Sequence, residues 1–77
     1  MRIEILGAGC GNCRALEANA RKAVAESGVK AEIVKIDDFV KIAEYGVLSL
    51  PAIVIDGEVK ASGSVPNVNE IKKWLIR

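Results

Sequence analysis

The chain has 77 residues, of which 51% are hydrophobic, 27% charged and only 4% aromatic, with two cysteines and no histidine. Residues 1–77 are expected to form one domain, because domains usually contain roughly 100–200 residues. Eleven basic and ten acidic side chains leave a net charge of +1, which argues against a nucleic-acid-binding surface. Without histidine, His-based catalysis and His-ligated zinc sites are excluded, so unusual chemistry must come from sulfur.

The hydropathy pattern favours a cytoplasmic protein that does not contact membranes. The start of the chain, from Met1 to Gly7, is charged too early for a secretory signal, and no run approaches the ~18 apolar residues of a transmembrane helix. In a reducing cytoplasm, a lone close pair of cysteines is catalytic or metal-binding more often than structural. As a crosslink, the short loop from Cys10 to Cys13 would stabilise the fold by only about 2 kcal/mol.

The hydrophobic pattern predicts seven elements in the order βαβαββα. Expected strands are rich in β-branched residues, whereas expected helices repeat apolar residues every three or four positions. Asp37 or Asp38 can cap the second helix. The expected strands are residues 3–6, 31–36, 52–55 and 58–61. The first expected helix begins after Cys13 and ends at Ser27. The second contains residues 39–43 and is ended by Gly46, and the third spans residues 69–76. The residues expected in the core include Val24, Ile36, Val54 and Trp74.

Two local sequence signals and one rule of chain topology indicate how these elements are arranged in a fold. Asp56-Gly57 between two β-rich runs predicts a tight hairpin, because both turn positions adopt positive φ. Asn67 and Glu70 have the spacing of a capping box at the last helix. The first βαβ unit implies parallel strands joined by a right-handed crossover. We therefore predict an α/β fold, with a four-stranded mixed sheet flanked by three helices.

Cys10 and Cys13 lie where the first strand gives way to the first helix. A spacing of three places both sulfur atoms on one face of the first turn, close enough for a disulfide. Unpaired amide groups at the positive end of the helix dipole favour a thiolate at Cys10. We therefore predict that Cys10 is the attacking sulfur and Cys13 the resolving one. Gly7, Gly9 and Gly11 leave the approach to Cys10 free of side chains.

Pro51 precedes the third expected strand, and its position allows two interpretations. Proline cannot donate to a β-ladder, so it belongs at the start of the strand 52–55 and not in its middle. A cis Leu50–Pro51 bond would leave the Leu50 backbone free to pair with an incoming peptide. The alternative is an ordinary trans proline that begins a strand. The sequence leaves both interpretations open.

These features together resemble the thioredoxin/glutaredoxin superfamily, most closely its small prokaryotic redox-active disulfide proteins. The resemblance covers nearly the whole chain and rests on three segments, which are Gly9-Cys10-Gly11-Asn12-Cys13, Ser49-Leu50-Pro51-Ala52 and Asp56-Gly57. It implies a thioredoxin-like fold and disulfide exchange with protein substrates. The redox-active disulfide would then be the only reactive group, with no added cofactor.

The resemblance also implies roles for individual residues. Cys10 and Cys13 would exchange disulfides, Pro51 would be cis and face them, and Gly63 would line a substrate groove. The residues expected to bind the substrate are Gly9, Gly11, Asn12, Leu50, Pro51 and Gly63. A thioredoxin-reductase-like flavoprotein is the expected reductant, and a monomer is the expected state.

Some positions depart from the family pattern. Thioredoxins typically carry Trp and Pro where this chain has Gly9 and Asn12, so their reduction potential is not transferable. Glutaredoxins bind glutathione with a basic residue before the first cysteine and an acidic one after the last strand. Gly7-Ala8-Gly9 has no base and Gly63-Ser64-Val65-Pro66 has no acid. We therefore do not expect glutathione binding.

Glu4 lies six positions before Cys10, where by ungapped resemblance thioredoxins keep a buried Asp that shuttles a proton to the resolving cysteine. On a central strand covered on both faces, partial desolvation would suit Glu4 to general-base work. The alternative is a glutamate at a frayed end of the sheet, with its side chain in water. Both interpretations remain open at this point.

A soft-metal carrier is the alternative function from a different class. Small heavy-metal-associated domains also place Cys-x-x-Cys in the first loop, and thiolates suit copper and zinc. However, Ala8 stands where those domains carry Met, and residues 69–76 predict a helix where those domains end on a strand. Two thiolates cannot close a tetrahedral zinc site, so a metal would also need a second subunit.

Overall fold

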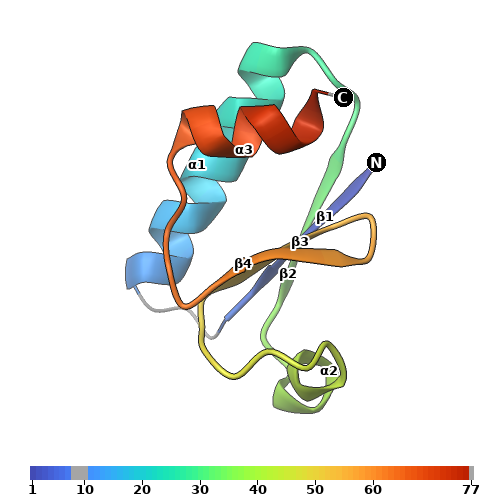
Figure 1. Ribbon diagram of the computed structural model, residues 1–77, viewed down its shortest axis with the longest axis vertical. Helices are drawn as coiled ribbons and strands as arrows, with labels where there is room; N and C mark the ends of the chain where they lie inside the picture. Colours follow the sequence, from blue (N-terminus) through green and yellow to red (C-terminus); the bar gives the residue numbers. More distant parts are fainter. Residues whose placement is uncertain (8–10, 77) are drawn as a thin grey trace.

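The structure is a computed structural model that describes residues 1–7 and 11–76. It contains the predicted order of elements, and their bounds differ from the expected ones by at most three residues, the largest difference being the earlier start of the first helix. In chain order they are β1 (Arg2–Leu6), α1 (Gly11–Ser27), β2 (Glu32–Ile36), α2 (Phe39–Glu44), β3 (Ala52–Ile55), β4 (Glu58–Ser62) and α3 (Val68–Leu75) (Figure 1). Within the described ranges, no helix has the length and apolar character needed to cross a membrane.

The strands form the predicted mixed sheet, in the order β2-β1-β3-β4. β1 pairs with β2 in parallel, whereas the β1–β3 and β3–β4 pairs are antiparallel. Ile5 of β1 has Lys35 of β2 on one side and Ile53 of β3 on the other. β1 and β3 are therefore the central strands, which explains why all four residues of β3 are buried.

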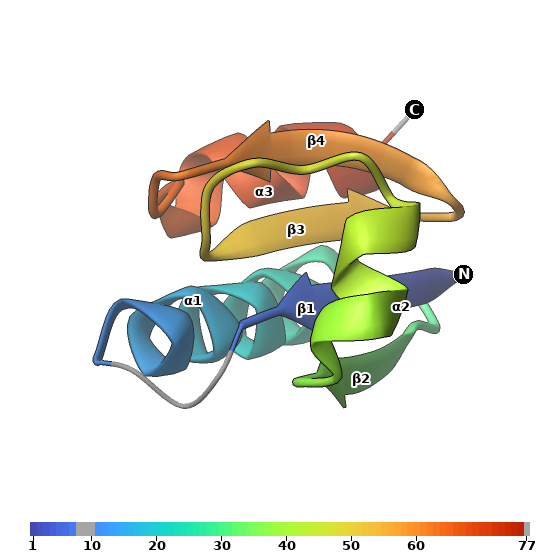
Figure 2. The same cartoon turned by 90° about the horizontal axis from the view of Figure 1, so that it is seen from below.

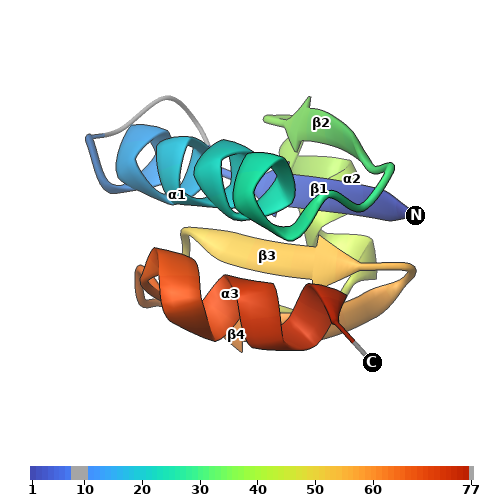
Figure 3. The same cartoon turned by 90° about the horizontal axis from the view of Figure 1, so that it is seen from above.

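The helices cover the two faces of the sheet unequally. α1 and α3 lie side by side on one face, in front of the sheet in Figure 3, and α2 lies on the other face, in front in Figure 2. Neighbouring residues on a strand point to opposite faces, so Ile3 and Ile5 face α1 while Glu4 and Leu6 face α2. The core on the α1 side contains Ile3, Ile5, Leu16, Ala20, Ala23, Ile53, Ile55, Ile71 and Leu75. The smaller cluster on the α2 side contains Leu6, Ile42, Ala52 and Val54.

The local signals form as predicted. Asp56 and Gly57 have φ values of 50° and 83° at the hairpin turn, the left-handed conformations that an Asp-Gly turn supplies. The capping box at α3 has both of its hydrogen bonds, because Asn67 accepts from the amide of Glu70 and the Glu70 side chain accepts from the amide of Asn67. Asp38 caps α2 by accepting from the amide of Val40 at 2.9 Å.

The expected core is partly wrong. Val54 is fully buried, but Val24, Ile36 and Trp74 are only half-buried and pack against the outside of the two clusters. On α3 the buried residues are Ile71 and Leu75, which are four positions apart and so share one helix face. Trp74 is partly buried and packs against the cluster on the α1 side.

Candidate active site

Cys13 lies in the first turn of α1 and is 7% exposed, whereas Gly11 and Asn12 beside it are exposed. The helix begins at Gly11, the residue that follows Cys10 in the sequence. Gly9 and Cys10 lie outside the described residues, so their predicted contacts stay predictions. The part of the site that the structure describes is therefore built around the buried sulfur of Cys13.

Gly7 is in close contact with the Cys13 side chain. A Cβ atom added at Gly7 would overlap the Sγ atom of Cys13 and would lie 3.9 Å from the Cα atom of Pro51. The Gly7 amide donates a hydrogen bond of 3.0 Å to the carbonyl of Ile36, which holds this position at the end of β2. The structure therefore brings Cys13 and Pro51 close to the same position beside Gly7, although they are far apart in the sequence.

Pro51 and Gly63, both assigned to the site from sequence, lie on adjoining segments. The Leu50–Pro51 peptide bond is cis, and Pro51 is buried. The Pro51 carbonyl accepts a hydrogen bond of 2.8 Å from the Gly63 amide. A Cβ atom at Gly63 would lie 2.8 Å from the Cβ atom of Ser49, so the absence of a side chain allows these segments to pack. Leu50, just before Pro51, remains 37% exposed.

A narrow pocket beside Cys13 contains charged residues that sequence reasoning did not single out. Glu17 receives a hydrogen bond of 2.7 Å from Nη2 of Arg21, and Nζ of Lys35 lies 3.5 Å from its other oxygen. The Arg21 hydrogen bond lowers the pKa of Glu17, although burial acts in the opposite direction. The available signal was the spacing of four between Cys13 and Glu17, which places both on one helix face. The pocket is lined by Ile5, Gly7, Cys13, Arg14, Glu17 and Lys35.

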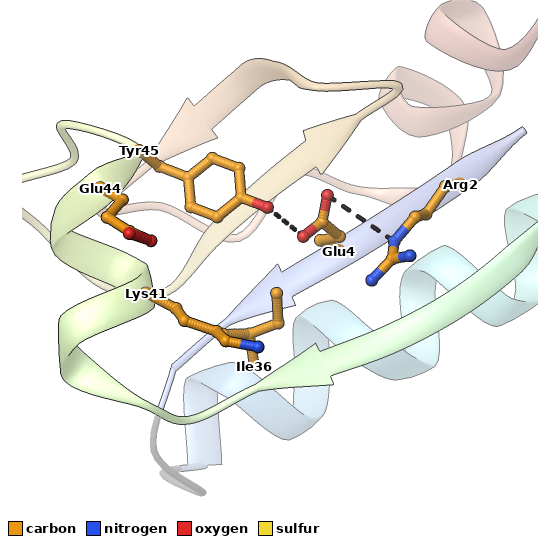
Figure 4. Close-up of a pocket in the computed structure, with 6 residues that line it drawn as sticks. All are labelled: Arg2, Glu4, Ile36, Lys41, Glu44 and Tyr45. Carbon is orange, nitrogen blue, oxygen red and sulfur yellow. Dashed lines mark hydrogen bonds and ion pairs between the residues drawn. The ribbon is translucent and has the colours of Figure 1, made fainter.

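Glu4 is buried, with 6% of its surface exposed, so the interpretation of a frayed end in water is wrong. Its strand is central in the sheet, and the hydroxyl of Tyr45 donates a hydrogen bond to its Oε2 atom (Figure 4). Nε of Arg2 lies 3.9 Å from the other carboxylate oxygen. Glu4 faces α2, whereas Cys13 lies on the α1 side in a different pocket. The proton role of Glu4 therefore stays a prediction.

The alternative function of a metal carrier would require side chains arranged to hold a metal ion. Within residues 1–7 and 11–76, there is no group of three or more His, Cys, Asp or Glu side chains arranged to do so. Cys10 lies outside this range, so the alternative of a carrier using both cysteines needs a direct measurement.

Comparison with known proteins identifies relatives over almost the whole chain. Residues 1–76 match the protein family described as "Thioredoxin domain". A thioredoxin from Methanothermobacter thermautotrophicus is 49% identical over 75 residues, which are 97% of each chain. A thioredoxin from Methanocaldococcus jannaschii is 42% identical over 73 residues, covering 95% of this chain and 84% of that protein.

A solved structure provides a comparison of the fold. The germline-specific thioredoxin Deadhead from Drosophila melanogaster superimposes with a TM-score of 0.62 at 22% identity. The superposition covers 96% of this chain and 76% of that one. At this identity the similarity shows the shared fold.

Proposed function

Because this chain belongs to the thioredoxin family, whose members are thiol–disulfide oxidoreductases, we propose that it exchanges disulfides with proteins through Cys10 and Cys13. The observation that supports this most directly is the packing of the buried Cys13 against Gly7, close to Pro51. This packing holds the Cys13 sulfur in the first turn of α1, three positions after Cys10, which suits the resolving role proposed for it.

The proposed reaction is two consecutive displacements at sulfur. The Cys10 thiolate attacks one sulfur of the target disulfide, the second target sulfur leaves as a thiolate and takes up a proton, and a mixed disulfide forms. Cys13 then loses its proton and attacks the Cys10 sulfur. The remaining target sulfur leaves as a thiolate, so the target gains two electrons and Cys10–Cys13 becomes the oxidised pair. The helix dipole favours the thiolate form of the first nucleophile.

The proposed substrate groove is formed by the segments around the cysteines. An extended peptide of the target would pair with the Leu50 backbone, as peptides do when they add to exposed backbone groups. Gly63 supports this proposal, because its lack of a side chain lets its segment pack against Ser49 next to Pro51. The remaining proposed contacts are Gly9, Gly11 and Asn12.

The proposed partners are protein disulfides and a reductase flavoprotein in the cytoplasm. The reductase would return Cys10–Cys13 to the dithiol after each cycle. Activity with glutathione is expected near background, and a rapid rate with hydroxyethyl disulfide and glutathione would contradict this. The equilibrium reduction potential would give the direction of electron flow, since about −270 mV suits a reductant and about −120 mV an oxidant.

Trapping the intermediate tests the roles of the two cysteines. Cys13→Ser removes the resolving thiol, so it should accumulate a covalent complex with a protein disulfide, detectable on a non-reducing gel and released by dithiothreitol. Cys10→Ser is the matched control and should trap none. Complexes with Cys10→Ser, or with neither variant, would contradict the assignment. Stoichiometric copper or zinc in the purified protein would favour the metal carrier instead.

A further inference from the structure

A polar pocket on the α2 side of the sheet contains a buried carboxylate. The Tyr45 hydroxyl, at the C-terminal end of α2, points at Glu4 of β1, and Arg2 approaches the same carboxylate from the other side (Figure 4). The pocket has a volume of about 280 Å³ and is lined by Arg2, Glu4, Ile36, Lys41, Glu44 and Tyr45. The hydrogen bond to Glu4 is the main reason that the pKa of Tyr45 is raised.

α2 has few other attachments to the rest of the molecule. It has six residues, too few to be stable as an isolated helix. Ile42 is its buried residue, whereas Phe39 and Val40 are 66% and 71% exposed. The position of α2 on the sheet therefore depends on Ile42 and on the contact of Tyr45 with Glu4.

The chain that leaves α2 leads directly to Pro51. Tyr45 and Val47 pack against the cluster on the α2 side, and Pro51 is held by the Gly63 amide. Between these points the chain is exposed, and Leu48 is 99% exposed. Residues 48–50 are therefore held between two attachments, one at Tyr45 and one at Pro51.

We propose that Tyr45, through its hydrogen bond to Glu4, positions residues 48–50 for contact with protein substrates. This inference rests on the proposed function. It makes Tyr45 a positioning residue, because it acts through the backbone that follows it and does not touch the reacting sulfur atoms. A hydrogen bond to a charged acceptor is stronger than a neutral one, so loss of the hydroxyl weakens the attachment and leaves Glu4 with fewer partners.

Comparing the kinetics of reduction of a protein disulfide and of a small disulfide isolates the positioning role of Tyr45. Tyr45→Phe removes the hydroxyl and keeps the ring in the cluster. The variant should raise KM for insulin about ten-fold or more, with kcat little changed, if the hydrogen bond contributes as charged hydrogen bonds usually do. The rate with 5,5′-dithiobis(2-nitrobenzoate), which is too small to need residues 48–50, should stay within about two-fold of wild type.

A control variant and a second measurement distinguish a positioning role of Tyr45 from a general loss of structure. Lys41→Gln alters an exposed residue of the same helix and pocket, and should leave both substrates unaffected. Amide hydrogen exchange of Tyr45 and Gly46, whose amides donate to the Ile42 and Ala43 carbonyls, should accelerate in Tyr45→Phe relative to that of β4. An unchanged KM for insulin, or equal changes with both substrates, would overturn the inference. A wild type that reduces neither substrate would overturn the proposed function itself.

Glu4→Gln separates this role from the predicted proton role of Glu4. Glutamine keeps an oxygen that accepts from Tyr45 but cannot take up a proton from Cys13. Because the acceptor is then neutral, positioning predicts a KM for insulin between those of the wild type and Tyr45→Phe. A slowed release of the mixed disulfide in stopped-flow measurements would support the proton role, whereas an unchanged rate together with the Tyr45→Phe effect would support positioning alone.

Discussion

The two faces of the sheet are stabilised in different ways. On the α1 side, two helices with 17 and eight residues cover a continuous apolar core, and α1 carries Cys13. On the α2 side, one helix of six residues covers a smaller cluster, next to a buried carboxylate. The same central strand supplies both faces, because Ile5 points to one and Glu4 to the other.

This difference matches the two tasks of the proposed site. The cysteine must be held in a fixed geometry, and close packing on the α1 side provides that rigidity. The segment proposed to contact substrates would have to fit different target peptides, and the thinly covered α2 side leaves it exposed. Thus the more closely packed face carries the sulfur, and the thinly covered face carries the segment proposed to bind peptides.

The largest expected effect is the loss of folding stability when a buried side chain is truncated, compared between the two faces. Leu16→Ala on the α1 side should reduce the free energy of unfolding by about 3–5 kcal/mol, because a fully buried side chain is removed from close packing. Ile42→Ala on the α2 side should cost about 2 kcal/mol, the lower end for such changes, since the cluster there is smaller. Urea denaturation measures both values, and equal losses would contradict the distinction between the faces.

A smaller effect is expected at the contact between Gly7 and Cys13. In Gly7→Ala the new methyl group overlaps Sγ of Cys13, so the cysteine or the strand end must move, at a cost of about 1–3 kcal/mol. We expect slower resolution of the mixed disulfide with both protein and small disulfides, measured by stopped flow. Gly11→Ala is the matched control for stability, because nothing lies within 4 Å of its Cβ position. Equal stabilities of the two variants would contradict the close packing at Gly7.

The smallest effect concerns acid stability on the α1 side. The pKa of Glu17 is lowered from 4.5 in the folded protein, so its ionised form stabilises the fold above that pH. This contribution is lost as pH falls below 4.5 through the folded pKa. Glu17→Gln should lower stability at pH 7 by about 0.5–1 kcal/mol and reduce the further loss in acid.

Thermal unfolding between pH 7 and 3 measures this difference. Glu26→Gln removes an exposed, ion-paired carboxylate from the same helix and controls for the change in net charge. Parallel pH profiles for wild type and Glu17→Gln would show that the Arg21 and Lys35 contacts contribute nothing to the fold.

The features predicted correctly depend on short stretches of chain. The Asp56-Gly57 turn and the Asn67–Glu70 capping box form within a few residues, so their residue types are enough to predict them. The mixed sheet also followed from the order of elements, because chain connectivity restricts how strands can pair. The prediction that Trp74 is a core residue was wrong, because Trp74 is one residue away from Leu75 on the helix and therefore does not share its buried face.

The partners of the charged residues could not be predicted in the same way. Glu4 and Tyr45 are 41 positions apart, and Glu17 meets Lys35 across a helix and a strand. No local sequence pattern indicates which side of the sheet an isolated carboxylate faces, or which residues cover that carboxylate. Glu4 was therefore assigned by resemblance to the resolving cysteine, whereas the structure pairs it with Tyr45.

The sequence by itself determined the type and order of the elements, the turn and the caps, because backbone preferences and apolar periodicity act over a few residues. It also placed two cysteines at a strand-to-helix junction. Only the tertiary structure decided that Cys13 packs against Gly7 near Pro51, and that Tyr45 meets Glu4. Those contacts depend on how the strands and helices pack in three dimensions, and close packing permits one arrangement of residues that are distant in the chain.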